Sequence, residues 1–292
     1  GGNDSMDTAN KLSKYFKEIG SDIKVIGVPK TIDNDLNCTD HTPGFGSAAK
    51  YLTVCLQEIT RDASVYDMKS VVIVETMGRN AGWLAASSCV LHKCGNKAPH
   101  LIYLPEVEFS IERFVNDVKQ QLAKNDTVIA VVSEGVEIEG STYMSENIDE
   151  FGHGFLSGGG KFLENIVKKE IGCKVRSIEL SVLQRCSAFM SSLTDITESE
   201  QIGSAAVEEA LKGNTGVMMC FKRISSSPYK IEISTTPAGE VANYEKKVPL
   251  EWINKEKNNV KDIAIEYFLP LLQGEQEFIM ENGIPKHIIA NN

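Results

Sequence analysis

The stretch Ser70-Val-Val-Ile-Val-Glu75 runs directly into Thr76-Met-Gly-Arg-Asn80, and this change from apolar to polar residues decides the fold. A short apolar run rich in β-branched residues predicts a strand that is buried on both faces. A second such run, TVIAVV at residues 127–132, follows a predicted helix at residues 110–124 that Ser110 opens. Because buried strands separated by helices are typical of parallel sheets, the sequence predicts an α/β fold.

The same alternation continues toward both ends of the chain. Ser5 is expected to cap an amphipathic helix that precedes a strand at residues 23–28. The stretch Tyr229–Thr235, flanked by Ser/Pro-rich turns, predicts an edge strand or hairpin rather than a crossover unit. Further helices are expected near residues 46–60, 80–92, 162–171, 198–211 and 260–272, and further strands near residues 101–104, 175–180 and 216–221.

Length and composition restrict the class of protein. A chain of 292 residues is long enough for one large or two medium domains, and without a linker or repeat the second domain is expected to be interleaved with the first. A net charge of -10 with no Lys/Arg block gives no electrostatic reason to bind nucleic acid or an anionic membrane. The seven scattered cysteines without a CxxC pair indicate neither disulfides nor zinc, and we expect a cytoplasmic protein.

Charged side chains follow three of the predicted strands, at the point where each strand ends. Lys30, Asp33 and Asp35 come after the first strand, Arg79 after the second, and Glu134 after the run at residues 127–132. Ligands of open α/β sheets bind beyond the carboxyl ends of the strands, so these side chains are expected at one edge. Phosphoryl transfer needs this combination, because cations hold the phosphate, one carboxylate accepts a proton and others position a divalent metal.

Simpler readings of these motifs remain open. Asp-Asn-Asp after a strand is also typical of an Asx-turn or a helix cap, and Gly-Arg before a helix is often a surface cap. The G-x-G-x-x-A match at residues 44–49 follows His-Thr-Pro rather than an apolar strand, so it lacks the context of a dinucleotide site. An NAD-dependent dehydrogenase is therefore disfavoured. None of the five histidines has the spacing of a metal ligand pair.

Six strings in order closely resemble the phosphofructokinase family over nearly the whole chain: GGNDS (1–5), GVPKTIDNDL (27–36), VETMGRNAGWLAA (74–86), LPEVEF (104–109), VVSEG (131–135) and RSIELSVLQR (176–185). The resemblance implies two similar Rossmann-like domains with mostly parallel sheets and the active site between them. It places residues 1–45 and 183–235 in a phosphoryl-donor-side domain and residues 46–182 and 236–292 in a fructose 6-phosphate-side domain. By the same comparison, the first strand-helix units of the family are missing before residue 1, which would expose a sheet edge and leave the donor site incomplete.

The resemblance also assigns roles to individual residues. Asp33 corresponds to the base that deprotonates the 1-hydroxyl of fructose 6-phosphate, and Lys30 and Arg79 to cations that assist the transfer. Arg176 corresponds to an arginine that reaches the sugar phosphate of a neighbouring subunit, which implies a homodimer or homotetramer with shared active sites. Val182 stands where many bacterial members carry His, so one phosphate hydrogen bond is absent. The remaining matches to substrate-binding positions are Thr31, Ile32, Asp35, Met77, Gly78, Glu134, Val182 and Arg185.

Two positions bear on the phosphate donor. Family members that use ATP tend to carry glycine where this chain has Asp4 and Lys30, and those that use pyrophosphate carry Asp and Lys. A carboxylate at position 4 repels the α-phosphate region of a nucleotide, whereas Lys30 can neutralise a departing phosphate that has no adenosine anchor. Mg²⁺ is the implied cofactor, with Asp35 and Asn3 as candidate ligands, although Asn3 replaces the Asp that is usual there.

The resemblance therefore implies a pyrophosphate-dependent phosphofructokinase, which converts fructose 6-phosphate and pyrophosphate reversibly to fructose 1,6-bisphosphate and phosphate. Two alternatives stay open. One is an ATP-dependent member of the family. The other is a non-catalytic regulatory subunit or sugar-phosphate-binding relative, which should have a damaged catalytic turn, whereas this chain keeps Asp33.

Overall fold

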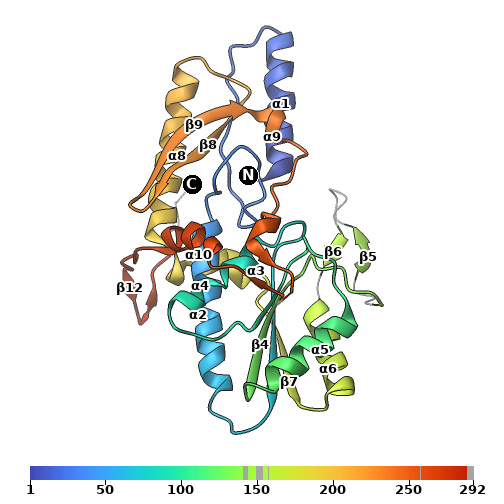
Figure 1. Cartoon of the computed structure of the whole chain (residues 1–292). Coiled ribbons are helices and arrows are strands. Elements are labelled where there is room, and N and C mark those ends of the chain that lie inside the picture. The colour runs from blue at the N-terminus through green and yellow to red at the C-terminus, as the bar shows by residue number, and fades with distance from the viewer. Residues whose placement is uncertain (141–143, 149–153, 157, 257, 288–292) are drawn as a thin grey trace.

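The chain forms two units, each built around its own sheet (Figure 1). The computed structural model describes residues 1–140, 144–148, 154–156, 158–256 and 258–287. We call the two parts the four-stranded unit and the three-stranded unit after their sheets.

The four-stranded unit contains the parallel sheet that the sequence predicts. Its strands lie in the order β3-β4-β2-β7, and every neighbouring pair is parallel. All of β2 and nearly all of β4 are buried, which explains their continuous apolar sequences. The strands are β2 (Ser70–Thr76), β3 (Leu101–Tyr103), β4 (Thr127–Ser133) and β7 (Lys174–Glu179).

Alternate side chains of β2 enter two different apolar cores. Val72 and Val74 pack with helices α2, α3 and α10 on one face, and Val71 and Ile73 pack with α5 and α6 on the other. Ser110 caps α5 by accepting a hydrogen bond from the Arg113 N–H, as the sequence predicts. The helices are α2 (Phe45–Ala63), α3 (Trp83–Ser87), α4 (Val90–Lys93), α5 (Ile111–Leu122), α6 (Gly159–Glu170) and α10 (Ile263–Phe268).

The three-stranded unit is thinner. Strand β1 (Ile26–Gly27) is parallel to β8 (Val217–Ser226), which forms an antiparallel hairpin with β9 (Tyr229–Pro237), so the predicted hairpin is confirmed. Helices α1 (Asn3–Glu18) and α9 (Ala238–Val241) contribute to a small core on one face, and α8 (Leu193–Leu211) packs on the other. Most of these elements fall within residues 1–45 and 183–235, but the end of β9 and all of α9 lie in the range that the resemblance assigns to the other domain. The domain boundaries stay a prediction.

Three local predictions are wrong. Helix α1 begins at Asn3 without a side-chain cap, because Ser5 lies in its first turn and packs against Gly1. The strand expected at residues 23–28 pairs only at Ile26–Gly27, since β8 starts opposite Ile26. The helix expected from residue 80 begins at Trp83, because the N–H of Gly82 is held by Glu106.

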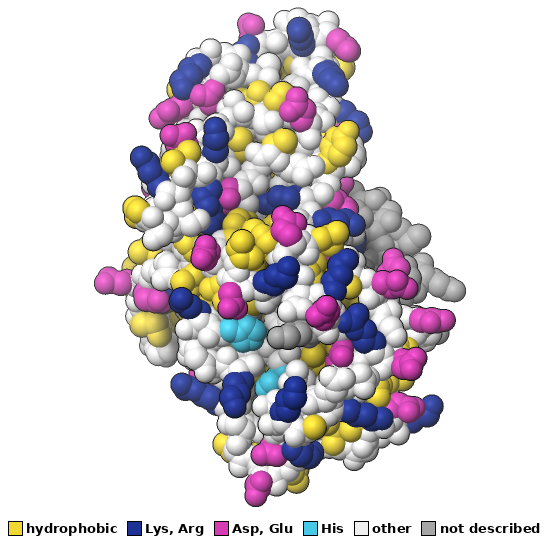
Figure 2. Space-filling model, viewed as in Figure 1, with side chains coloured by type: hydrophobic (Ala, Val, Ile, Leu, Met, Phe, Trp, Pro, Cys, Tyr) yellow, Lys and Arg dark blue, Asp and Glu magenta, His cyan; other side chains and the backbone are white. Residues whose placement is uncertain are grey.

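No helix in the described ranges is long and apolar enough to cross a membrane. Basic and acidic side chains are interspersed over the face shown in Figure 2. The short elements are α7 (Leu183–Cys186), the 3-10 helices η1 (Ala188–Met190), η2 (Leu250–Trp252) and η3 (Leu269–Leu272), and the strands β5 (Met144–Ile148), β6 (Gly154–Leu156), β10 (Ile253–Asn254), β11 (Asn259–Val260), β12 (Met280–Glu281) and β13 (Ile284–Pro285).

Candidate active site

The TIDND turn (residues 31–35) follows β1 and lies where the two units meet. Its backbone is fixed at Thr31, which forms a parallel bridge with Gly44, and the Asp33 N–H donates to Thr31 Oγ1 at 3.1 Å. Asn34 adopts a left-handed conformation with φ 55° and is fully buried. Asparagine tolerates this conformation better than most residues, so the turn carries a residue suited to its geometry. Ile32 belongs to the large apolar core and also lines the cavity beside the turn.

Asp33 is a largely buried carboxylate that faces three cations. Burial raises the pKa of Asp33, and the hydrogen bond from Thr31 and the charges of Arg79, Lys30 and Arg185 oppose that rise. The structure thus brings together four residues that the sequence places in three separate motifs. A poorly solvated carboxylate among cations is suited to accept a proton beside an anionic phosphate.

Two further carboxylates share this environment. Burial raises the pKa of Asp35 to about 6, and the charges of Asp33 and Glu245 add to the effect. Burial likewise raises the pKa of Glu134 to about 7 although its Oε1 accepts the Gly78 N–H at 3.2 Å; Asp33 and Glu75 raise it further, and Arg79 opposes. The neighbouring cations balance this group of carboxylates only in part, and such a group favours binding of additional positive charge.

The MGR loop (residues 77–79) is held from three sides. The Met77 N–H donates to Gln184 Oε1 at 3.1 Å, and Ser133 Oγ donates to the Gly78 carbonyl at 2.7 Å. A Cβ atom at Gly135 would lie 1.9 Å from the Arg79 carbonyl, so only glycine permits this approach. The loop that carries Arg79 is therefore fixed by residues from β4 and α7.

The start of α1 lies beside the TIDND turn. The Lys30 N–H donates to the Gly1 carbonyl at 3.0 Å, and Asp4 is exposed in the first turn of α1. Asn3 bonds the loop after α9, because its Nδ2 donates to the Tyr244 carbonyl and its Oδ1 accepts from a backbone N–H. Both ends of the amide are engaged by the protein, and this structural role gives no support to Asn3 as a metal ligand.

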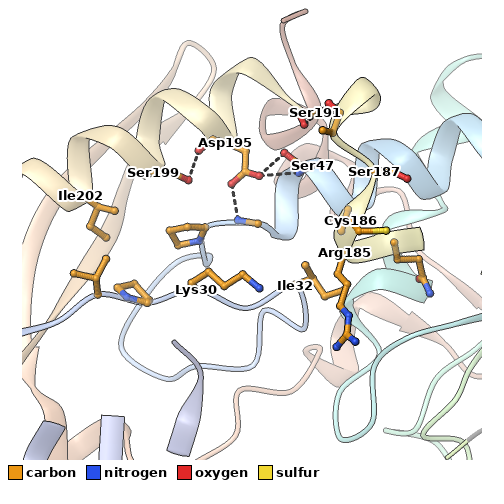
Figure 3. Close-up of a pocket in the computed structure, with 17 residues that line it drawn as sticks. Lys30, Ile32, Ser47, Arg185, Cys186, Ser187, Ser191, Asp195, Ser199 and Ile202 are labelled. Carbon is orange, nitrogen blue, oxygen red and sulfur yellow. Dashed lines mark hydrogen bonds between the residues drawn. The ribbon is translucent and has the colours of Figure 1, made fainter. Parts of the chain in front are cut away.

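A cavity of about 470 Å³ opens beside the turn (Figure 3). Lys30 and Arg185 line it together with the hydroxyl-bearing Ser47 and Ser187. In the view of Figure 3, Lys30 and Arg185 lie across the cavity from Asp195. The volume is within the range of small-molecule sites, and the two cations favour an anionic occupant.

Asp195 explains why the glycine-rich stretch at residues 44–49 is not a phosphate loop. Its carboxylate accepts the N–H groups of Gly44 at 2.8 Å and Ser47 at 3.0 Å, so it occupies the N-terminus of α2. Gly46 is needed for close packing, since a Cβ there would lie 2.5 Å from the Leu271 carbonyl. The sequence argument against a dinucleotide site agrees with this geometry.

Arg176 and Val182 are separate from the carboxylate cluster. Arg176 lies on the edge strand β7, in a hollow that Glu58 and Asp62 also line. Its exposure on that edge is compatible with a contact to another subunit, which stays a prediction. Val182 is 50% exposed at the start of α7 and is an apolar residue at a position where the family often has a phosphate ligand.

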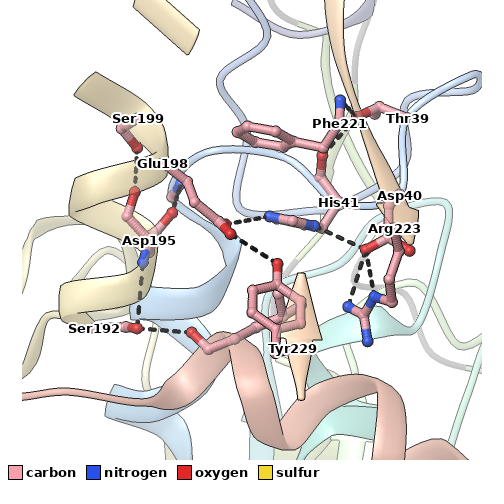
Figure 4. Close-up of polar contacts among 12 residues, drawn as sticks. Thr39, Asp40, His41, Ser192, Asp195, Glu198, Ser199, Phe221, Arg223 and Tyr229 are labelled. Carbon is pink, nitrogen blue, oxygen red and sulfur yellow. Dashed lines mark hydrogen bonds and ion pairs between the residues drawn. The ribbon is translucent and has the colours of Figure 1, made fainter. Parts of the chain in front are cut away.

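Sequence reasoning missed a polar network that joins the loop after the TIDND turn to α8, β8 and β9 (Figure 4). His41 is buried between Asp40 at 2.8 Å and Glu198 at 2.7 Å. Arg223 from β8 bonds Asp40 at 2.9 Å, and Tyr229 from β9 donates to Glu198 at 2.8 Å. No spacing rule links residues so far apart in the chain, so only the folded structure reveals them.

It also missed Glu245 and Lys246, which approach the turn from the loop after α9. Glu245 faces Asp35 and bonds Asn80, and Lys246 bonds Asn34. In the sequence they belong to a polar run with no strand before it, which is typical of a solvent-exposed loop.

The fold and the site together define an α/β protein with a phosphate-transfer type of centre, in which carboxylates and cations that follow strands of two different sheets meet between the units. The phosphofructokinase family matches residues 1–210, and the chain belongs to this family. It is 40% identical over 298 residues to the pyrophosphate--fructose 6-phosphate 1-phosphotransferase of Xanthomonas campestris, covering 100% of this chain and 71% of that protein. The protein of the same name from Halomonas elongata is 37% identical, over 98% of this chain and 69% of its own length. The crystal structure of a pyrophosphate-dependent phosphofructokinase from Marinobacter aquaeolei superposes with a TM-score of 0.87 at 34% identity, covering 100% of this chain and 72% of that one.

Proposed function

We propose that the protein transfers a phosphate from pyrophosphate to the 1-hydroxyl of fructose 6-phosphate, giving fructose 1,6-bisphosphate and phosphate. The observation that carries the proposal is the buried Asp33 carboxylate, which faces Arg79, Lys30 and Arg185. The names of the relatives that match this chain over 98–100% of its length support the choice of substrates.

Each charged residue has a separate task in this reaction. Asp33 takes the proton of the attacking hydroxyl, and its poor solvation makes it a stronger base than an exposed aspartate. Arg79 and Lys30 balance the charge of the transferring and departing phosphates. Thr31, Met77, Gly78, Glu134 and Arg185 bind the sugar phosphate, and Arg176 reaches the site of a neighbouring subunit in a homodimer or homotetramer.

The donor is selected at the start of α1. Asp4 and Lys30 belong to two chain segments that are joined by the bond between the Gly1 carbonyl and the Lys30 N–H. The exposed Asp4 disfavours the additional phosphate of a nucleotide, and Lys30 favours the compact pyrophosphate anion.

Enzymes of the phosphofructokinase family generally require Mg²⁺, and the residues present fit this ion. Mg²⁺ is usually held by one or two carboxylates together with substrate phosphates, and Asp35 is the carboxylate that this turn would offer while Asp33 acts as the base. The raised pKa of Asp35, about 6, shows a carboxylate that additional positive charge would stabilise in its ionised form. When bound, Mg²⁺ would neutralise negative charge on the phosphate oxygens.

All seven cysteines are free, which is typical of the reducing cytoplasm where we place the protein.

The first experiment compares pyrophosphate and ATP as donors to fructose 6-phosphate in the presence of Mg²⁺. We expect turnover with pyrophosphate and little with ATP. Asp4→Gly combined with Lys30→Gly should lower the rate with pyrophosphate and raise the ratio of ATP to pyrophosphate use. Turnover of the unaltered chain with ATP alone would contradict the donor assignment.

The variant Asp33→Ala tests the role of the proposed base. This change should lower kcat by roughly 10³-fold or more while fructose 6-phosphate still binds, because it removes a proton acceptor rather than an anchor. Calorimetric titration with fructose 6-phosphate provides the binding readout. Equal losses of binding and turnover would contradict the role of Asp33, and binding without turnover in the unaltered chain would favour a regulatory relative.

A further inference from the structure

The loop after α9 connects three parts of the active site. We call residues 243–246 the clamp segment. Its Tyr244 carbonyl accepts from Asn3 at the start of α1, at 2.7 Å. Its Glu245 accepts from Asn80, which directly follows the MGR loop. Its Lys246 contacts the TIDND turn, so one short segment touches the donor side, the base and the acceptor side.

The Lys246 ammonium closes the loop that the TIDND turn begins. It donates to Asn34 Oδ1 at 3.3 Å, to the Thr39 carbonyl at 3.1 Å and to the Asp40 carbonyl at 2.8 Å. An ammonium has three donors, and all three have acceptors here. Lys246 therefore joins residue 34 to residues 39 and 40, the start and the end of the same loop.

The backbone of Lys246 links this loop to the helix behind the MGR loop. Its N–H donates to the Asp35 carbonyl at 2.7 Å, and its carbonyl accepts the indole N–H of Trp83 at 2.7 Å. The ammonium also lies 5.0 Å from the centre of the Trp83 ring, which adds a cation–π contact. Since Trp83 begins α3, the same residue fixes both segments that carry the site.

Asn34 connects Lys246 to the catalytic base, because it binds Lys246 and directly follows Asp33 in the chain. Its side chain is fully buried, and its Nδ2 donates to the Tyr267 hydroxyl at 2.9 Å while Lys246 bonds its Oδ1. Its left-handed backbone, with φ 55°, reverses the chain between Asp33 and Asp35. A buried amide that loses one of its two partners is strongly destabilised in that position, so release of Oδ1 should loosen both carboxylates.

The charge of Lys246 is maintained although the group is buried. Burial lowers the pKa of Lys246 to about 8, and the charges of Asp40 and Asp35 oppose that change, whereas Arg223 adds to it. The three acceptors of its nitrogen are all oxygen atoms, and three donated bonds require the ammonium form. A neutral residue of similar length would leave three oxygen atoms without this donor.

We propose that Lys246 is a positioning residue for the proposed phosphate transfer: by binding Asn34 and the end of its loop, it holds Asp33 in line with the sugar hydroxyl. The inference rests on the proposed function and deepens it. Lys246 itself does not touch the substrate, so its effect is on the alignment of the base rather than on substrate affinity.

The test compares Lys246→Met with Lys247→Met. The two lysines are neighbours, but Lys247 is exposed and serves as the matched control. We expect Lys246→Met to lower kcat with pyrophosphate by about 10²-fold, with KM for fructose 6-phosphate changed less than about 3-fold, because a small misplacement of a reacting group has an effect of this size. Lys247→Met should leave both constants unchanged. A loss confined to KM, or equal losses in both variants, would overturn the proposal.

Hydrogen exchange provides a readout that does not depend on activity. In Lys246→Met, exchange should become about 10-fold faster in peptides that cover residues 33–40 and stay unchanged in β2 and β4, because local opening affects only the released loop. Unchanged exchange at residues 33–40 would contradict the claim that Lys246 holds this loop, even if the unaltered chain transfers no phosphate. Faster exchange with an unchanged kcat would contradict the claim that Lys246 aligns Asp33 for catalysis, although Lys246 would still hold the loop.

A second variant covers the case in which Lys246→Met does not fold. Asn34→Gly keeps the left-handed backbone accessible but removes the acceptor for Lys246. It should reproduce the loss in kcat, and the double variant should lose little more than either single one, because the two residues act through one contact. Additive losses would overturn the proposal.

Discussion

The two sheets are stabilised in different ways. In the four-stranded unit, β2 and β4 are buried almost throughout and separate two extensive apolar cores. In the three-stranded unit, β9 alternates between half-buried and exposed residues, and its two cores contain only a few buried residues each. Buried polar contacts compensate for this thin packing, among them those of His41, Asp40 and Glu198.

The difference between the two units bears on the active site, because each unit contributes site residues that are held in a different way. Strands with large cores hold the MGR loop and Glu134 at fixed positions, whereas the segments that carry Asp4, Lys30 and Asp33 depend on directed hydrogen bonds. The stability of a polar network depends on pH, whereas that of an apolar core depends on how completely its space is filled. We therefore expect the two units to respond differently to the same kind of substitution.

The largest effect on stability is expected in the four-stranded unit. Phe114→Ala should lower the free energy of unfolding by about 3–5 kcal/mol, because the side chain is fully buried against Tyr103 and Phe109. Phe221→Ala in the three-stranded unit should lower it by about 3 kcal/mol, at the low end of this range, since its smaller core can relax into the space. Urea unfolding of both variants measures the difference, and equal losses would show that the two cores are equivalent.

A smaller effect, dependent on pH, is expected in the three-stranded unit. Burial alone would lower the pKa of His41, but its hydrogen bonds to Asp40 and Glu198 and their charges raise it above its usual value. Protonated His41 therefore stabilises the folded state fully below about pH 6.5, and this contribution is lost as the pH rises through the folded-state pKa. His41→Gln should lower the free energy of unfolding by about 2 kcal/mol at pH 6.

The same variant should differ less and less from the unaltered chain as the pH rises through the folded-state pKa of His41. Burial lowers the pKa of Lys246 to about 8, so the difference between the two proteins at each pH is the quantity to measure. A difference that does not change with pH would show that His41 contributes by packing against Phe221 rather than by charge.

The smallest effect is expected where α1 meets the clamp segment. Asn3→Asp keeps the acceptor for the Asn243 N–H but loses the donor to the Tyr244 carbonyl, so it should lower the free energy of unfolding by about 0.5–1 kcal/mol. Asn3→Ala loses both bonds and should lower it further. Thermal unfolding provides the comparison, and an unchanged midpoint in Asn3→Ala would show that this contact is not needed.

The sequence predicts the four-stranded unit well because its signals are local. Uninterrupted β-branched runs identify β2 and β4, whose ends carry Arg79 and Glu134. The expectation of a single sheet edge is wrong, because Asp33 follows β1, which pairs with β8 in the other sheet. The prediction of Ser5 as a cap was wrong because it depended on a single residue type, and glycines before the helix allow it to begin at Asn3.

The sequence does not predict the contacts that position the base. Asn34 is joined to Lys246 across 212 residues, and His41 to Glu198 across 157 residues. Such pairs have no periodicity, and a lysine in a polar run gives no sign that its ammonium is enclosed. The roles of the individual site residues remain predictions that rest on the resemblance and on this geometry.

The wide separation of these partners also determines when the site can form during synthesis. All strands of the four-stranded sheet are available once residue 179 has been made, whereas β1 must wait for β8, which begins at residue 217. At roughly 5–20 residues per second, β1 remains unpaired for about 10–40 seconds after it is made. The clamp segment follows later still, and α10, which covers one face of β2, is made only after it. A nascent chain that stops before residue 243 can therefore pair the four strands and cover the face that packs on α5 and α6, while the other face lacks α10 and the TIDND turn is still cleaved by protease.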